Sequence, residues 1–241
     1  MSVLFPLSLI RNGHFSWCQH RSQLRSADHE CHTCRFQLYL FATHLSCGMA
    51  FIEFWGGLHT GSASLWSDAW HVVSDSLGYG IGAAYASLAL SHRVTKQKLG
   101  QHRQRAEFVL GALLVLAAAS IFSDVAGRLW FRDLPEVHEP KTLLLIASVG
   151  LGVNVLVLLL LHGFGSGHGH TGHSHDHSRD RILQANLWHT FGDAASSLLV
   201  IVNALILNVT SHPLWRYLDL GIAALIASML LYQAISILAE D

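Results

Sequence analysis

The sequence predicts an all-α membrane protein with six transmembrane helices, and three observations support this fold class. Of the 241 residues, 51% are hydrophobic and only 13% are charged, whereas about 25% of the residues of a soluble domain are charged. Apolar runs recur along the chain, and each can cross a hydrocarbon core of roughly 30 Å as a helix. These runs lack the strict alternation of membrane strands, so helices rather than a barrel satisfy the backbone in lipid. The composition and the net charge of −1 argue against a soluble enzyme and a nucleic-acid partner.

The apolar runs define six candidate spans, which we expect at residues 36–52, 65–90, 108–129, 143–161, 182–207 and 217–238. The first and the fourth contain no Asp, Glu, Lys or Arg. We therefore divide the chain into an N-terminal segment, 1–35, and a six-helix transmembrane domain, 36–241. The last span ends close to the final residue, so we expect no soluble domain after it.

The distribution of basic residues predicts the orientation of the spans. Of the 15 Lys and Arg residues, 11 lie in the N-terminal segment or in the loops after the second and fourth spans. Basic residues collect in cytoplasmic loops, so both termini and the histidine-rich loop 163–180 are predicted to be cytoplasmic. The protein is expected to be integral and multi-pass, in a bacterial inner membrane or in an organelle or plasma membrane.

Two of the spans carry the same short motif of ionisable residues. Residues 70–76 read WHVVSDS in the second span, and residues 188–194 read WHTFGDA in the fifth. His71 and Asp75 are four residues apart, as are His189 and Asp193, so each pair lies on one face of its helix. A carboxylate at bilayer depth costs about 2.5–3.5 kcal/mol on insertion scales, so matching pairs in equivalent spans favour a function. A structural hydrogen bond between helices is the alternative.

If the two faces meet, they supply two imidazoles and two carboxylates, a ligand set suited to tetrahedral Zn²⁺. Two carboxylates also neutralise a divalent ion within the bilayer. One motif falls in each three-helix half, and because three helices reverse the chain direction, the halves are predicted to have inverted topology. Inverted repeats with a site near the membrane midplane are typical of transporters.

Three further polar residues are candidates for supporting this site. Asp68 precedes His71 by three residues, and it either accepts a hydrogen bond from that imidazole or caps the start of the second span. Glu53 follows the first span and is expected at the membrane interface, or as a group that assists the access of the ion. Asn154 is expected to face the bundle interior, with a structural hydrogen bond as its alternative role.

Two segments are candidates for capturing metal in the cytoplasm. The loop after the fourth span contains five histidines, His168, His170, His173, His175 and His177. Its spacing is irregular and rich in glycine, so a solvated linker with incidental metal affinity is the alternative. The N-terminal segment contains Cys31 and Cys34 beside two histidines, but one Cys-x-x-Cys alone is a weak indication of a metal site.

The stretches that carry these motifs resemble the cation diffusion facilitator family of zinc transporters. Residues 52–80, IEFWGGLHTGSASLWSDAWHVVSDSLGYG, are similar to the family's first-span exit, short loop and second-span motif. Residues 187–206, LWHTFGDAASSLLVIVNALI, are similar to its fifth span. A histidine-rich loop between spans four and five is also typical of its zinc members. The resemblance extends from about residue 38 to residue 238, and we expect a short form without the family's C-terminal cytoplasmic domain.

The resemblance implies an activity as well as a fold. It implies export of a divalent cation, Zn²⁺ above all, from the cytoplasm in exchange for protons, by alternating access. In the family, the residues that match His71, Asp75, His189 and Asp193 form the transport site, and a histidine at the first position of both motifs is associated with zinc. Members are usually homodimers. Zn²⁺ is thus expected as the transported substrate, with no other cofactor and no enzymatic activity.

Other functions remain open from the residues alone. Paired histidines on facing helices also ligate haem in b-type cytochromes, although the Asp after each His has no role there. A membrane metal sensor would use the same four ligands without transporting the ion. An intramembrane metallohydrolase is disfavoured, because the chain contains no His-Glu-x-x-His sequence.

Overall fold

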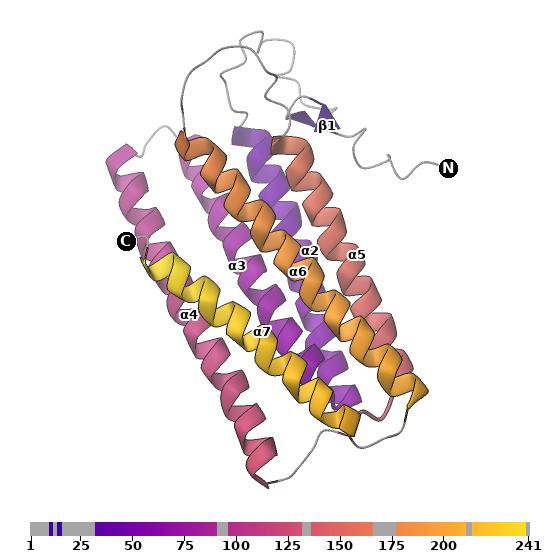
Figure 1. The fold of residues 1–241 in the computed structure, drawn as a ribbon. Helices are drawn as coiled ribbons and strands as arrows, with labels where there is room; N and C mark the ends of the chain where they lie inside the picture. Colours follow the sequence, from indigo (N-terminus) through magenta and orange to yellow (C-terminus); the bar gives the residue numbers. More distant parts are fainter. Residues whose placement is uncertain are drawn as a thin grey trace.

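The computed structural model describes residues 10–11, 14–15, 32–90, 96–131, 136–165, 177–210 and 214–239. These residues form six long helices and one pair of two-residue antiparallel strands, β1 (Ile10–Arg11) and β2 (His14–Phe15). The helices are α2 (His32–Thr60), α3 (Ala63–Leu90), α4 (Lys96–Phe131), α5 (Pro140–Gly165), α6 (His177–Val209) and α7 (Leu214–Ala239), and they form one elongated bundle (Figure 1). The predicted all-α class is confirmed.

The six helices follow the predicted order but extend beyond the predicted spans. Thus α2 continues past residue 52 to Thr60, and α4 begins at Lys96 rather than near residue 108. An apolar run marks only the part of a helix that faces lipid, whereas the backbone hydrogen bonds continue through polar residues. The division at residue 35 and the cytoplasmic placement of both termini stay predictions.

Hydropathy and length single out three of the described helices as clear membrane spans. They are Phe108–Phe131, Pro140–Leu161 and Trp215–Ala239, while α6 contains a shorter apolar stretch, Asp193–Val209. In α2 and α3 the mean hydropathy is lowered by polar side chains such as Glu53, Asp68 and Asp75, and the structure buries all three. These three carboxylates therefore face the bundle interior rather than lipid.

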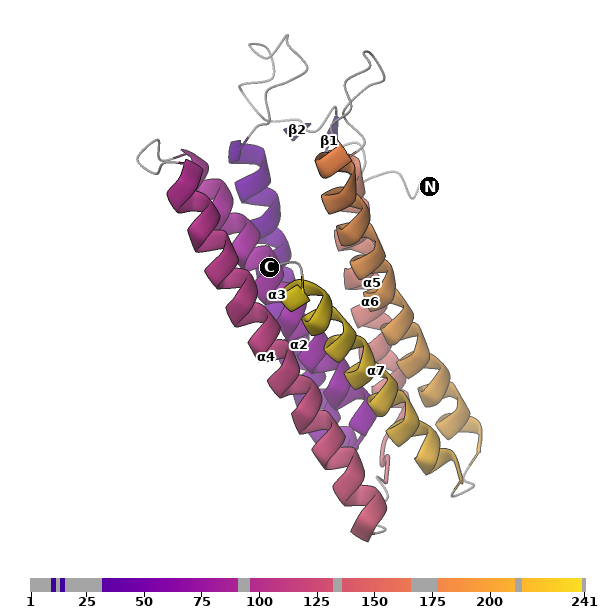
Figure 2. The same cartoon turned by 60° about the vertical axis from the view of Figure 1, so that its left-hand side comes forward.

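Helix α3 lies at the centre of the packing, since it contacts α2, α4, α6 and α7. Two main apolar clusters surround it. One joins α2, α3, α5, α6 and α7 through side chains such as Leu65, Leu143 and Ile226. The other joins α4 to α7, which lie side by side in both views (Figures 1 and 2). Here alanines such as Ala118, Ala223 and Ala227 let the two backbones approach closely.

The start of α3 is capped by a carboxylate from another helix. Asp219 of α7 is fully buried. It accepts hydrogen bonds from the backbone N–H of Ala63 at 2.7 Å, and from the hydroxyls of Ser62 at 2.8 Å and Ser64 at 2.6 Å. Asn203 of α6 donates to the same carboxylate at 2.6 Å. A negative charge at a helix N-terminus is favourable, so Asp219 ties α3, α6 and α7 together.

We expect the substitution Asp219→Asn to destabilise the fold. It keeps the side-chain shape but replaces one acceptor oxygen by a donor, which leaves buried donors at the start of α3 unsatisfied. The free energy of unfolding should fall by about 2 kcal/mol, measured as a lower midpoint of thermal unfolding in detergent. Ser228→Ala is the matched control on α7, because that exposed hydroxyl bonds only to the Ala224 carbonyl of its own helix. Equal midpoints for both variants would contradict this role of Asp219.

Candidate metal site between α3 and α6

Helix α3 directs three ionisable side chains into the bundle. Asp68, His71 and Asp75 are spaced three and four residues apart, so they share one face of the helix. Their exposed fractions are 0%, 1% and 4%. Helix α6 adds Asp193, which is 1% exposed. The helical repeat and the packing of α6 on α3 thus gather these groups in the buried interior of the bundle.

A contact across the two helices joins the two motifs. His71 Nε2 lies 2.5 Å from Asp193 Oδ1, although the residues are 122 positions apart in the sequence. Together with Asp75 they form a buried group in which one ligand atom from each residue lies within 4.8 Å of the others. We call His71, Asp75 and Asp193 the acidic triad.

The chemistry of the acidic triad suits a divalent cation. It offers one imidazole nitrogen and two carboxylate oxygens, which are common ligands of Zn²⁺. Ligands of a tetrahedral zinc lie about 2.1 Å from the ion and hence about 3.4 Å from one another. The spacings reach up to 4.8 Å, whereas the His71–Asp193 contact is shorter, at 2.5 Å. Side-chain rotations that narrow the wider spacings and widen this contact would fit the three ligands around an ion.

Hydrogen bonds between helices connect the polar residues that surround the triad. Ser196 of α6 donates to Asp68 at 2.8 Å, and Ser197 lies 3.4 Å from the other oxygen of the same carboxylate. Asn154 of α5 donates to the Ser197 hydroxyl at 3.1 Å and to the Asp193 backbone carbonyl at 3.3 Å. Asn154 therefore faces the bundle interior and connects α5 to the segment of α6 that carries Asp193.

The structure decides against the capping alternative for Asp68. Helix α3 begins at Ala63, a full turn before Asp68, and Asp219 already caps that end. The described hydrogen bonds of Asp68 instead join α3 to the two serines of α6. The serine pair was not singled out in the sequence, although Ser196 and Ser197 follow Asp193 by three and four residues and so share its face.

Glu53, which was expected at the membrane interface or as a group that assists the access of the ion, faces the interior of the bundle. Because α2 continues to Thr60, Glu53 sits within the helix, and its side chain is fully buried. The position of Glu53 relative to the membrane interface stays a prediction.

Several predicted site residues lie outside the described part of the molecule. His189 belongs to α6 and precedes Asp193 by one turn, but its side chain is not among those described. The same holds for His177, the first residue of α6, while Cys31, His168, His170, His173 and His175 lie outside the described residues altogether. Cys34 is described: it is 1% exposed in the first turn of α2, where it packs with Leu38 and Leu160.

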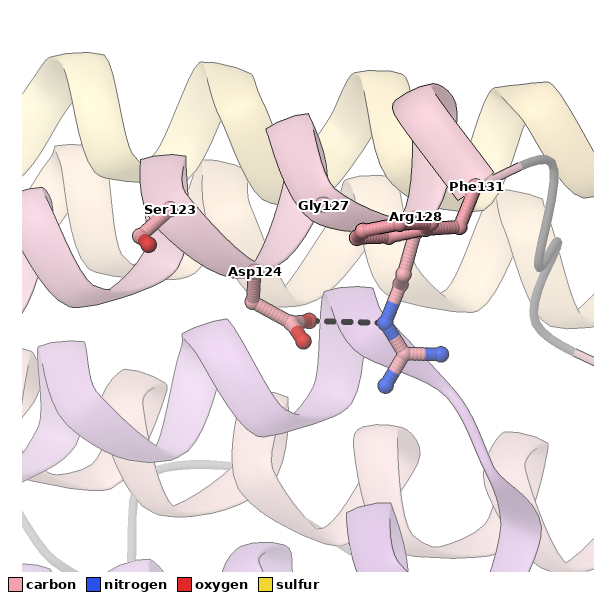
Figure 3. A pocket seen from close by; sticks show the side chains of 5 residues that line it. All are labelled: Ser123, Asp124, Gly127, Arg128 and Phe131. Atoms are coloured by element: carbon pink, nitrogen blue, oxygen red, sulfur yellow. Dashed lines mark hydrogen bonds and ion pairs between the residues drawn. The ribbon is translucent and has the colours of Figure 1, made fainter.

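A surface pocket on α4 is separate from the triad. It has a volume of about 360 Å³ and is lined by Ser123, Asp124, Gly127, Arg128 and Phe131, all from one helix (Figure 3). Arg128 donates to Asp124 at 2.8 Å, and both side chains are partly exposed. The two residues are one helical turn apart on the outside of the bundle, so their contact lies within α4 alone.

Comparison with known protein families agrees with the geometry. Residues 40–241 match the family described as the cation efflux transmembrane domain. A comparison with curated proteins finds no match. The family match includes all six helices apart from the first turns of α2, and it contains the whole acidic triad. Members of such a family are transporters rather than enzymes. The protein is therefore an integral, multi-pass membrane protein that belongs to the cation diffusion facilitator family of metal cation efflux transporters, as its motifs predicted.

Proposed function

We propose that the protein exports Zn²⁺ from the cytoplasm by exchanging it for protons. The observation that carries this proposal is the acidic triad, in which a buried imidazole and two buried carboxylates converge from α3 and α6. His189 is the fourth proposed ligand, because it lies one turn before Asp193 on the same helix. Two imidazoles and two carboxylates give a neutral site when Zn²⁺ is bound.

The contact between His71 and Asp193 suggests how protons and metal exchange. A hydrogen bond joins His71 Nε2 to Asp193 Oδ1. The lone pairs that hold this proton are those that would bind the ion, and a metal binds only deprotonated ligands. A proton and Zn²⁺ therefore compete for the same atoms. Protons that arrive from the far side would displace the metal, and their loss would restore the site.

Access from both sides of the membrane requires the two ligand-bearing helices to move relative to each other. The ligands come from only two helices, so a small displacement of α6 against α3 opens or closes the site. We infer that the two inverted halves rock around it, with both termini in the cytoplasm, and that the protein works as a homodimer. The basic loops support this orientation, and the family resemblance supports the dimer.

The remaining alternatives make different demands on the site. A haem protein would need both histidines as axial ligands and would gain nothing from Asp75 and Asp193 beside them. A metal sensor would bind the ion in the same way and would differ only in showing no flux. Measurement of flux therefore separates transport from sensing.

Replacing Asp193 with Ala should abolish zinc uptake into proteoliposomes under a pH gradient. The substitution removes one ligand and the carboxylate that contacts His71 from α6, and the loss should exceed about 100-fold. Uptake is followed with a zinc-sensitive dye trapped inside the vesicles. The matched control is Asp124→Ala, which removes an exposed carboxylate on α4 and should transport normally. Near-normal uptake by the Asp193→Ala protein would refute the proposed site.

Zinc binding should weaken as the pH falls. An ordinary histidine titrates near pH 6.5, and each proton that the metal must displace reduces the affinity by up to about tenfold per pH unit. Titration calorimetry between about pH 7.5 and about pH 6.5 measures this change, with the Asp193→Ala protein as the background for zinc bound elsewhere. An affinity independent of pH would argue against proton exchange.

Asn154→Ala should weaken zinc binding without abolishing it. The Asn154 amide donates hydrogen bonds to the Asp193 backbone carbonyl and to the Ser197 hydroxyl. Loss of such a hydrogen bond next to the metal ligands typically reduces metal affinity by about 10–100-fold. Titration of the purified protein with zinc measures this loss. The control on the same helix is Ser148→Ala, because that exposed hydroxyl bonds only to the Leu144 carbonyl of α5. If both variants bind zinc equally well, Asn154 does not support the site.

A further inference from the structure

Glu53 of α2 is a buried carboxylate that the proposed site does not use. Its side chain is 0% exposed. Neither of its oxygens has a hydrogen-bond partner among the described residues. The other buried carboxylates differ, since Asp68 accepts from two serines, Asp193 contacts His71, and Asp219 caps α3.

The packing around Glu53 leaves room for its carboxyl group and little else. Gly150 of α5 faces it, and a Cβ atom at that glycine would lie only 2.6 Å from Glu53 Oε1. The methyl group of Met49 borders the same space. Because glycine has no side chain, position 150 leaves an apolar space in which the carboxyl group of Glu53 fits.

The charged groups near Glu53 do not compensate a negative charge on it. From α3, the charges of Asp68 and Asp75 act on it, and the imidazole of His71 already contacts Asp193 of α6. On α5, the described side chains include one charged residue, the exposed Lys141 at the start of the helix. On α2 itself, the nearest ionisable side chains, Cys47 and His59, are exposed. With respect to the described residues, an ionised Glu53 would thus be a buried charge without a compensating cation, which is costly.

We propose that Glu53 is a proton-binding group of the transport cycle, separate from the metal ligands. Its carboxyl holds a proton in the conformation described here and loses that proton when a divalent cation occupies the acidic triad. The O–H bond breaks, the electron pair stays on the carboxylate, and the proton passes to water on the side to which the bundle is open. The positive charge of the ion stabilises the new carboxylate, since charges interact strongly in a low-dielectric interior. This inference rests on the proposed zinc transport.

The test counts the protons released when zinc binds. The full-length protein is titrated with zinc in buffers that differ in ionisation enthalpy, which gives the number of protons released per ion. Glu53→Gln has the shape of the protonated carboxyl but no proton to lose. It should bind zinc and release about one proton fewer than the unsubstituted protein. Glu53→Asp, which keeps an ionisable group, and Asp124→Asn, which changes an exposed carboxylate, should release the same number as the unsubstituted protein.

The possible results separate the two proposals. Equal proton release by the unsubstituted and Glu53→Gln proteins would overturn the role of Glu53 and leave zinc transport standing. If the unsubstituted protein binds no more zinc than Asp193→Ala, the proposed function fails and this inference fails with it. Should Glu53→Gln not fold, infrared spectroscopy of the unsubstituted protein replaces it. Zinc should then remove the carbonyl band of a protonated carboxylic acid, and an unchanged band would overturn the proposal.

Discussion

The burial of carboxylates inside an apolar bundle is the constraint on which the rest of the structure depends. Removing such a group from water costs several kcal/mol unless a donor or a cation compensates it. The bundle meets this cost differently at each position: Asp219 caps a helix, Asp68 accepts from serines, and Asp193 contacts an imidazole. Each contact joins different helices. The carboxylates whose burial is costly therefore also determine how the helices pack.

The same constraint connects the fold to cation transport. Among the described side chains, the acidic triad combines one imidazole with two buried carboxylates. Such a site gains stability from any bound cation, whether a proton or a metal ion. Binding therefore needs little reorganisation, and competition between the two kinds of cation follows from their use of the same lone pairs. By contrast, the Asp219 carboxylate accepts hydrogen bonds from Ser62, Ala63, Ser64 and Asn203, which indicates a structural role.

Much of this arrangement was predictable from local sequence patterns, and the rest depended on distant contacts. The apolar runs predict six helices, and the spacing of His71 and Asp75 predicts their common face. Neither pattern reports where a helix ends, so the first span was ended at residue 52 although α2 continues to Thr60. The role of Asp219 was not predicted because its partners are distant in the sequence: Ser62 lies in the turn before α3, and Asn203 lies on α6. A single acidic residue near the start of an apolar span also forms no recognisable motif. Only the packed bundle reveals such partnerships.

The central claim is that the motifs of α3 and α6 bind one zinc ion together. Anomalous X-ray scattering from crystals of the zinc-loaded protein tests it most directly, because the signal locates the metal without reference to activity. The account predicts a peak between α3 and α6, about 2.0–2.2 Å from ligand atoms of His71, Asp75 and Asp193, with His189 completing the tetrahedron. A fully loaded protein with no peak between these two helices would contradict the account.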